Sequence, residues 1–493
     1  MAFKHAHQHY SKKDIARIAT EAMVERGLEP EFSEAAIQQL EKINTAAVAN
    51  NPEIFDLVDL LWCSLDNDDS MDLDQLTSSQ VLKNGLVKIF VAVADVDALV
   101  KKDSALDEHA KINTASIYTS ARIFPMLPEK LSTNLTSLNQ DEDRLAVVTE
   151  MVINKDGSIH QSHVYRAKVR NKAKLAYDAV SDWIEKKGPA PEALSRVKGM
   201  QEQLITQDKT AQILRRRRHE QGCLELEIFQ PKAIFDGEQV VAVQQQVQNR
   251  GRQLIEEFMI ATNECTAKFL AAQGHASLRR VVRSPESWLR IVELAKKYNE
   301  QLPSQPNSKA LATFLAKRHK ADPLRFPDLS LVVVKLMGSG EYVVEQPNAE
   351  PIGHFGLAVQ DYTHSTAPNR RYPDLITLRM IKGALQNTPP PYGNEDLKTL
   401  AEHCSQQEDA ARKVERRVRK SEAALLLSSH LNQTFDAVVT GSSSSATWVR
   451  ILDMPIEGLL EEGEPNLDVG RKLRVRLVSV NVEKGFIDFI QVS

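Results

Sequence analysis

Five aspartates lie within nine residues of one another in the stretch S-L-D-N-D-D-S-M-D-L-D-Q, residues 64–75. They are Asp66, Asp68, Asp69, Asp72 and Asp74, and no basic residue lies among them. Such closely spaced negative charges repel one another unless a cation lies between them. Oxygen ligands without Cys or His suit Mg²⁺ or Mn²⁺ rather than Zn²⁺. Two such ions could hold a phosphodiester, one activating water and the other stabilising the leaving oxygen.

Two other interpretations of this cluster are a calcium-binding EF-hand loop and a solvated acidic turn. An EF-hand loop needs Gly at its sixth position and Glu at its twelfth. Counted from Asp66, those positions hold Met71 and Thr77, which excludes that loop. An apolar run, residues 57–62, precedes the cluster and a second apolar strand follows it. A charge cluster set among core strands favours a metal site over a solvated turn.

The cluster resembles the signature of the ribonuclease II (RNB) family of processive exoribonucleases. In that family an aspartate is followed by three more at offsets of six, eight and nine, which here are Asp72, Asp74 and Gln75 after Asp66. Gln75 stands where the family usually has Asp, so it keeps one neutral oxygen ligand and loses a charge. Asp68 or Asp69 could compensate. Further segments resemble the family in the same order along the chain: 90–96, 117–132, 173–183, 255–263 and 354–375.

The resemblance implies an active site built from several of these segments. Asp74 and Arg370 take the catalytic positions, with Mg²⁺ or Mn²⁺ as the cofactor held by Asp66, Asp72, Asp74 and Gln75. A guanidinium such as Arg370 can stabilise charge that develops on a phosphate. For Arg371 the alternative to RNA binding is a structural salt bridge to Asp374.

Other matched positions are implied to hold the 3′ end of the RNA. Tyr118 stands where an aromatic ring stacks on a base, and stacking accepts every base. Leu226, in G-C-L-E-L-E, stands where the family usually has the partner aromatic, and an aliphatic side chain cannot stack in the same way. Tyr177 and Glu256 also match positions near the RNA end, where a carboxylate can accept a hydrogen bond from the 2′-hydroxyl. The alternatives are a core tyrosine and an ordinary helix-surface acid, which is the expected fate of Glu257.

Several basic stretches could follow a phosphate backbone. Arg166, Lys168, Arg170, Lys172 and Lys174 alternate along a predicted strand, so they share one face. A phosphate track and a solvated, edge-protecting face are equally compatible with that pattern. Residues 215–218, R-R-R-R, present the same choice, and for residues 413–420 a solvated helix is favoured. The alternating His5, His7 and His9 indicate a terminal segment rather than a metal site.

The elements that must position these residues indicate an α+β catalytic RNB domain, a C-terminal all-β OB-fold barrel and a short helical N-terminal segment. We expect the following division: residues 1–50, two helices; 51–390, the catalytic domain; 391–432, its helical C-terminal part; and 433–493, an RNA-binding OB-fold. In the barrel Trp448 could be a stacking platform or a core residue, and Arg450 and Arg474 could meet phosphates. We expect no cold-shock barrels like the family's ahead of the catalytic domain, because the residues before the acidic cluster read as helices. These N-terminal helices suit a packing appendage better than a nucleic-acid-binding unit.

Composition narrows the class of protein. The 493 residues hold 62 Lys and Arg against 66 Asp and Glu, so any nucleic-acid binding must come from local patches. The sequence has no apolar run long enough for a membrane helix and no secretory signal, and its four cysteines are widely spaced. These features predict a cytoplasmic protein with reduced cysteines and no zinc site.

The sequence therefore predicts a processive 3′-to-5′ exoribonuclease that hydrolyses single-stranded RNA to nucleoside 5′-monophosphates by a divalent-metal mechanism. Its expected partner is single-stranded RNA, without a membrane and without an obligate protein partner. Two alternatives stay open: a catalytically weakened RNA-binding regulator, which Gln75 and Leu226 favour, and a broader metal-dependent nuclease that also acts on DNA.

Overall fold

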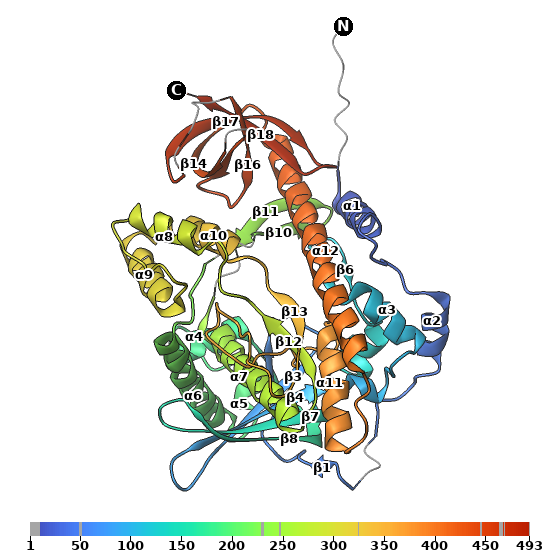
Figure 1. Cartoon of the computed structure of the whole chain (residues 1–493). Helices are drawn as coiled ribbons and strands as arrows, with labels where there is room; N and C mark the ends of the chain where they lie inside the picture. Colours follow the sequence, from blue (N-terminus) through green and yellow to red (C-terminus); the bar gives the residue numbers. More distant parts are fainter. Residues whose placement is uncertain are drawn as a thin grey trace.

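The computed structural model describes the whole chain except residues 1–9, 49–51, 228–230, 246–247, 324, 444–445, 463–466, 468 and 493. His5, His7 and His9 therefore lie outside the described residues. At the centre is a seven-stranded mixed sheet in the order β1-β8-β7-β4-β3-β2-β9 (Figure 1). Its strands are β1 (Phe55–Asp56), β2 (Cys63–Asp66), β3 (Gln75–Val81), β4 (Val87–Ala94), β7 (Asp143–Ile153), β8 (Ile159–Arg170) and β9 (Ala173–Ala176).

The central strand β4 is apolar except for Lys88, because both faces of the sheet are covered. Phe90, Ala92 and Ala94 belong to one hydrophobic cluster, and Ile89 and Val91 belong to another. Side chains alternate between the faces of a strand, so each set packs beneath a different layer of helices. The buried strand predicted for residues 87–96 is thereby confirmed over Val87–Ala94.

Helices cover both faces of the sheet. The hydrophobic cluster on one face includes residues of α3 (Ala105–Asn113), α11 (Tyr372–Leu385) and the first half of α12 (Asn394–Leu427). The cluster on the other face includes residues of α4 (Tyr177–Ile184), α5 (Glu192–Ser195), α6 (Met200–Gln221) and α7 (Arg250–Ala272). The acidic segment connects β2 to β3, so it lies at an edge of this sandwich rather than inside one layer.

Smaller elements surround the sheet. A separate apolar cluster unites α8 (Trp288–Lys296), α9 (Ser308–Ala321) and α10 (Phe326–Met337). Two short hairpins are β5 (Ile117–Tyr118) with β6 (Ile123–Phe124), and β10 (Pro231–Asp236) with β11 (Gln239–Gln245). A two-stranded antiparallel sheet joins β12 (Ser277–Val281) to β13 (Glu341–Glu345), which are far apart in sequence. The short helical turns are η1 (Val96–Ala98), η2 (Lys130–Leu135) and η3 (Ser428–His430). No helix among the described residues combines the length and apolar character needed to cross a bilayer.

The C-terminal strands close into a barrel in the order β14-β15-β16-β18-β17. They are β14 (Thr434–Ser442), β15 (Thr447–Ile451), β16 (Glu457–Glu462), β17 (Lys472–Asn481) and β18 (Phe486–Val492). Gly458 lets β16 approach β18, since a Cβ there would lie 2.5 Å from the Phe489 ring. The expected fold class, an α+β catalytic domain with an OB-like barrel and N-terminal helices, is confirmed.

The N-terminal helices α1 (Lys12–Val24) and α2 (Glu34–Glu41) have a packing role, as the sequence favoured. Ile15 of α1, Val418 of α12 and Val475 of the barrel share one hydrophobic cluster. The expectation that Arg450 meets phosphates is wrong. Its guanidinium is buried and makes a two-pronged ion pair with Asp328 of α10, at 2.9 and 3.0 Å, which joins the barrel to the α8–α10 cluster.

Candidate active site

Asp74 is the most buried acid of the acidic segment, with 1% of its surface exposed. One of its oxygens accepts a hydrogen bond from the Asn369 backbone N–H at 2.9 Å, and the other accepts one from Arg370 Nε at 3.0 Å. Burial raises the pKa of Asp74 to about 7, although Arg370 and the Asn369 N–H oppose that rise. The buried carboxylate therefore aims the Arg370 guanidinium, because the two groups are joined through Nε.

Two more acids of the segment, Asp72 and Asp66, also lie near Arg370. Asp72 accepts a hydrogen bond from the Tyr118 hydroxyl at 2.8 Å. Asp66, at the end of β2, accepts one from Ser70 Oγ at 3.0 Å. Burial disfavours the charge of Arg370, but Asp74, Asp66 and Asp72 outweigh it and raise the pKa of the guanidinium. The structure thus brings three of the predicted ligands around one cation.

Gln75 and the two remaining aspartates occupy different surroundings. Gln75 begins β3 and is 5% exposed, and its side-chain amide has no hydrogen-bond partner among the residues that the structure describes. Asp68 and Asp69 are exposed on the connection between β2 and β3. Gln75 is therefore better placed than either of them to add an oxygen to the buried side of the site.

The donor set fits a hard divalent cation in its chemistry. Asp66, Asp72, Asp74 and Gln75 offer only oxygen atoms from carboxylates and an amide, as Mg²⁺ prefers. Over the described part of the chain, no group of three or more His, Cys, Asp or Glu side chains is arranged in a metal-holding geometry. Arg370 instead neutralises the acids, so the ligand roles of these residues stay predictions.

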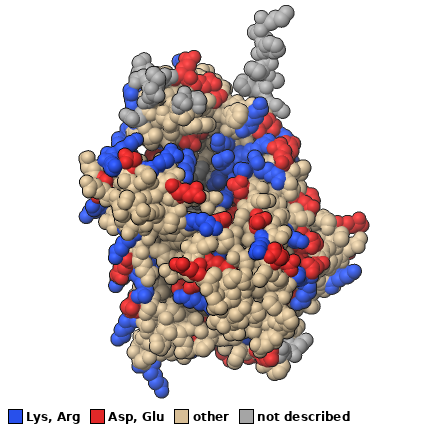
Figure 2. Space-filling model, in the orientation of Figure 1, with Lys and Arg blue, Asp and Glu red and all other residues tan. Residues whose placement is uncertain are grey.

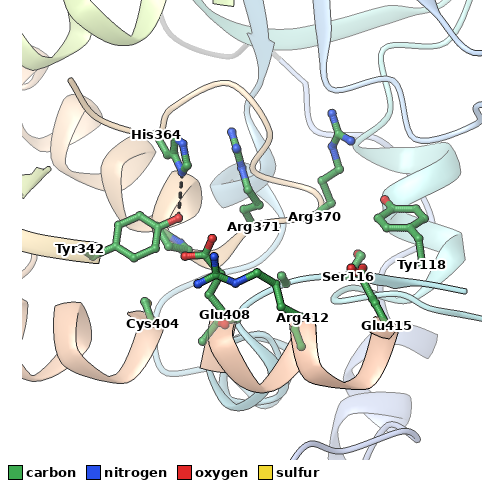
Figure 3. A pocket seen from close by; sticks show the side chains of 14 residues that line it. Ser116, Tyr118, Tyr342, His364, Arg370, Arg371, Cys404, Glu408, Arg412 and Glu415 are labelled. Carbon is green, nitrogen blue, oxygen red and sulfur yellow. Dashed lines mark hydrogen bonds between the residues drawn. The ribbon is translucent and has the colours of Figure 1, made fainter. Parts of the chain in front are cut away.

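A pocket of about 290 Å³ opens beside Arg370 and Tyr118 (Figure 3). Residues of α12, including Glu408, Arg412 and Glu415, form its opposite wall. Arg371 also lines the pocket, but its Nη2 donates to Asp374 Oδ1 at 2.7 Å. The salt bridge that was the alternative for Arg371 is therefore present, and it fixes the first turn of α11.

The residues predicted to hold the RNA end lie on α4 and α7. Tyr177 begins α4 and packs under the Arg252 guanidinium, whose carbon is 4.6 Å from the ring centroid. Glu256 keeps 43% of its side chain exposed and accepts a hydrogen bond from Gln248 at 3.0 Å. Glu257 is not the surface acid that we expected, because it is 2% exposed and pairs with Arg218.

Leu226 and Trp448 are the remaining predicted contacts. Leu226 is half-buried and packs against the α8–α10 cluster. Trp448, on β15, is 38% exposed, and the Lys420 ammonium lies 5.3 Å from the centroid of its ring. Trp448 is therefore available as a platform on the barrel surface rather than enclosed in the barrel core.

The alternating basic residues of β8 make structural ion pairs rather than an open phosphate track. Arg166 pairs with Asp95, Lys168 with Asp56 and Arg170 with Asp143. In the run of arginines on α6, three of the four also pair: Arg215 with Glu225, Arg217 with Asp156 and Arg218 with Glu257. Ion pairs within the protein, which the interpretations of these two stretches did not include, thus engage six of their cations.

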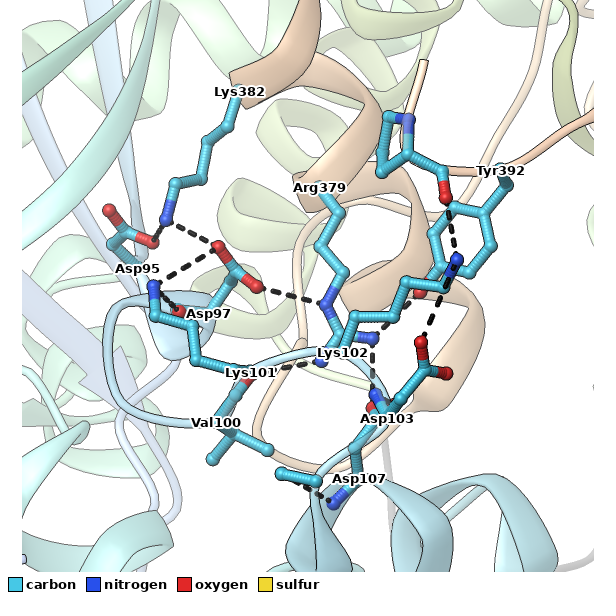
Figure 4. A network of polar contacts seen from close by, with 12 residues as sticks. Asp95, Asp97, Val100, Lys101, Lys102, Asp103, Asp107, Arg379, Lys382 and Tyr392 are labelled. Atoms are coloured by element: carbon cyan, nitrogen blue, oxygen red, sulfur yellow. Dashed lines mark hydrogen bonds and ion pairs between the residues drawn. The ribbon is translucent and has the colours of Figure 1, made fainter. Parts of the chain in front are cut away.

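A buried charge network that sequence reasoning missed positions the helix behind Arg370 (Figure 4). Lys382 of α11 pairs with Asp95 at 2.7 Å and with Asp97 at 2.6 Å. Arg379, one turn earlier, pairs with Asp97 at 2.9 Å and with Asp107 at 2.8 Å. Arg370 lies two residues before the start of α11. By fixing α11, this network therefore helps to position Arg370. The signal in the sequence that could have indicated this network was Asp95, which follows the apolar strand in F-V-A-V-A-D-V, residues 90–96.

Arg252 was missed as well. It precedes Glu256 by four residues, which places both on one face of α7. Its Nη2 donates to Asn67 Oδ1 at 2.8 Å, so it links α7 to the acidic segment. Helical spacing from Glu256 was the signal that could have found it.

Comparisons with known proteins agree with this architecture. Ribonuclease R of Thermotoga maritima is 29% identical over 89% of this chain, which spans 65% of that relative, less than two thirds of its length. The structure of Mycoplasma genitalium RNase R, which has also been solved with single-stranded RNA, superposes with a TM-score of 0.87 at 23% identity, covering 97% of this chain and 78% of that one. Yeast Ssd1, described as a pseudonuclease, has a TM-score of 0.69 at 16% identity, covering 91% of this chain and 55% of its own.

The fold alone therefore does not decide whether a chain cleaves RNA, and the site residues must decide it. The model of the RNase II-type exonuclease C-terminal S1 domain matches residues 433–492. The RNB domain model matches residues 55–387, well over half of the sequence, and the chain belongs to the RNB family.

Proposed function

We propose that this chain is a 3′-to-5′ exoribonuclease that hydrolyses single-stranded RNA to nucleoside 5′-monophosphates and does so processively. The observation that carries the proposal is the gathering of Asp66, Asp72 and Asp74 around the partly exposed Arg370, beside the exposed ring of Tyr118. Oxygen ligands for a cation and a guanidinium for a phosphate thus share one site, as phosphodiester hydrolysis requires.

RNB-family ribonucleases depend on divalent metal ions in general, and Mg²⁺ or Mn²⁺ suits the donors here. When bound, such an ion would activate water and neutralise charge on the phosphate. Asp66, Asp72, Asp74 and Gln75 would hold it. Arg370, which Asp74 orients through Nε, would face the scissile phosphate with the rest of its guanidinium.

The remaining residues orient the polymer. The Tyr118 hydroxyl is anchored on Asp72, so the ring is held while its face stays available for the terminal base. Glu256 offers an exposed carboxylate oxygen to a ribose 2′-hydroxyl, which would select RNA over DNA. Leu226 gives only apolar contact, so we expect a looser hold on the last base than two aromatic rings would give.

The second candidate is an RNA-binding protein with weakened catalysis. Gln75 favours it, because one charge that the family normally supplies is absent. The third candidate is a nuclease that also degrades DNA. If Glu256 did not contact the ribose 2′-hydroxyl, the site would have no means of selecting RNA over DNA at that position.

Digestion of 5′-labelled 20-nucleotide RNA and DNA strands with Mg²⁺ separates the three candidates. We expect stepwise shortening of RNA from the 3′ end, release of 5′-monophosphates, an intact DNA strand, and full arrest by EDTA. Asp74→Asn should be inactive, whereas the exposed Asp68→Asn serves as a matched control and should keep its activity. RNA binding without cleavage in either Mg²⁺ or Mn²⁺ would support the regulator, and equal loss of DNA would support the broad nuclease.

A further inference from the structure

Arg252 connects three segments that each carry a residue of the candidate site. It lies in the first turn of α7, four residues before Glu256. Its Nη2 donates a hydrogen bond to Asn67 Oδ1 at 2.8 Å, and its guanidinium carbon lies 4.6 Å from the centroid of the Tyr177 ring. Arg252 therefore contacts the acidic segment and α4 at the same time.

Many surface cations of this protein make contacts of a different kind. On the face that Figure 2 shows, Lys and Arg side chains lie beside Asp or Glu at many places, as expected for surface ion pairs. An example on α7 itself is Lys268, whose ammonium lies 2.5 Å from Glu264 Oε1. Exposed pairs of this kind fix a side chain only weakly, because water screens them. Arg252 contacts an amide and an aromatic ring, and both constrain the direction of a planar guanidinium.

The segments that Arg252 joins leave the central sheet side by side. Strands β2 and β9 are parallel, and Asp66 pairs with Ala176 in their register. Asn67 follows Asp66 at the end of β2, and Tyr177 follows Ala176 at the end of β9. Both connections therefore begin at the same edge of the sheet, and Arg252 bridges the first residue of each.

The start of α7 holds Arg252 in place. The Arg252 backbone N–H donates to the Asn249 side chain at 3.0 Å, and Asn249 Nδ2 donates to Asp178 Oδ1 of α4 at 2.6 Å. Gly251 lets the two helices approach closely, because a Cβ there would lie 2.9 Å from the Tyr177 carbonyl oxygen. The N-cap of α7 is thus tied to α4, and the Arg252 side chain extends from a fixed point.

Through Asn67 the contact of Arg252 reaches Asp66, a predicted ligand of the metal ion. The Asn67 backbone N–H donates to Asp66 Oδ1 at 2.7 Å, and Ser70 Oγ donates to the same oxygen at 3.0 Å. Both of these bonds use Oδ1, so within the described chain they leave Oδ2 for a cation. Groups that surround a metal ligand commonly set its orientation in this way. Fixing Asn67 therefore fixes the direction of the Asp66 carboxylate.

We propose that Arg252 is a positioning residue that fixes Asp66 and Tyr177 relative to each other, so that the acids for the cation and the residues for the RNA end act as one unit. The identities of the cation and the polymer rest on the proposed function. Arg252 itself contacts neither of them, and it acts through Asn67 and through the Tyr177 ring. Loss of Arg252 loosens the acidic segment, and the affinity for the cation falls.

The direction of this effect separates positioning from charge. Because like charges repel, removal of the Arg252 charge alone would tighten the binding of a nearby divalent cation. Release of Asn67 has the opposite effect, since the Asp66 carboxylate then loses its orientation. Substitutions of the groups around metal ligands commonly lower metal affinity by about ten- to a hundredfold. Arg252 acts through one further residue, so we expect Arg252→Gln to weaken Mn²⁺ binding by about tenfold.

The test is the dissociation constant of Mn²⁺, measured by electron paramagnetic resonance on the full chain without RNA. Arg252→Gln and Asn67→Ala should each raise it by about tenfold, and the double variant should raise it no further, because both substitutions break the same contact. Arg250→Gln is the matched control. It breaks an ion pair between α7 and Asp208, at 2.6 Å, and should leave the Mn²⁺ dissociation constant unchanged.

The proposal is overturned if Arg252→Gln binds Mn²⁺ as tightly as the wild type or more tightly, or if the effects of the two single substitutions add. It is also overturned if Asn67→Ala keeps the wild-type affinity, a result that stands even where Arg252→Gln does not fold. A wild type that binds no Mn²⁺ overturns it as well. Mn²⁺ binding without RNA needs no catalysis, so a wild type whose Mn²⁺ affinity depends on Arg252 but that releases no monophosphate would refute the proposed function alone.

Discussion

Glu422 offers a quantitative test of how α12 packs against the rest of the protein. It is 2% exposed, and one of its carboxylate oxygens accepts a hydrogen bond from Ser120 Oγ at 3.3 Å. The other oxygen is buried and has no partner within the described chain. Burial raises the pKa of Glu422 from its ordinary 4.5 to about 7, against the opposing effects of Ser120 and Arg419.

The sign follows from comparing protonation in the folded and unfolded protein. Folding raises this pKa, so the folded protein is most stable when Glu422 is protonated. The contribution of protonated Glu422 to the free energy of unfolding is fully present below pH 4.5 and is lost as the pH rises through 7. The difference between the two pKa values corresponds to about 3 kcal/mol of stability above that range. Glu422→Gln keeps the shape and removes the charge, so it should recover most of that free energy at alkaline pH.

The assay is urea unfolding of the wild type and of Glu422→Gln at about pH 5 and about pH 8.5, where the gain from the substitution should be about 1 and about 3 kcal/mol respectively. Glu402→Gln, on the exposed side of the same helix, is the matched control and should show no such pH dependence. A gain from Glu422→Gln that is equal at both pH values would refute the reasoning, because it could not come from ionisation.

Three further predictions concern the site and the barrel. Asp74→Asn should lower kcat by at least roughly a hundredfold with RNA affinity nearly intact, since it removes a ligand charge and keeps the volume; wild-type turnover in a single-turnover assay would remove Asp74 from the site. Gln75→Asp should lower the Mg²⁺ concentration needed for half-maximal rate, because it restores a charged ligand, and an unchanged Mg²⁺ titration would mean that Gln75 is not a ligand. Arg450→Met should cost about 3 kcal/mol by leaving Asp328 buried without its partner. Adding Asp328→Leu should return most of that stability, and equal thermal melts for the single variant and the wild type would contradict the buried pair.

Much of the fold was predictable because its signals are local. The apolar run of β4, the alternation in the barrel strands and the helical spacing of α1 each specify one element from its own residues. The order of the strands in the sheet was not predictable in this way. The neighbours β8-β7-β4-β3 follow chain order, but β2 pairs with β9 across more than a hundred residues, and no local pattern records such a pairing.

The candidate site was predictable in its residue types and not in its contacts. The resemblance brought Asp74 and Arg370 together, and the structure joins them across a separation of 296 residues. The sequence pattern could not show which arginines form ion pairs with acids in the folded protein. Arg166 and Arg450 were candidate phosphate ligands, yet both meet buried carboxylates supplied by distant segments.

The hydrophobic cluster shared by α1, α12 and the barrel has a consequence for how the chain folds. The cluster joins α1 to the barrel, two regions that are far apart in the sequence. The hydrogen bond between Arg17 and Glu483 links residues separated by 466 positions. Contacts of such separation form late, because closing the intervening loop costs entropy that only the completed interface offsets. During synthesis the apolar stripe of α1 therefore stays uncovered at least until α12, against which it packs, has been made. The barrel strands pair with near neighbours in the sequence and can form the barrel without α1. The interface between the barrel and the rest of the protein is complete only when α1 has packed into the shared cluster.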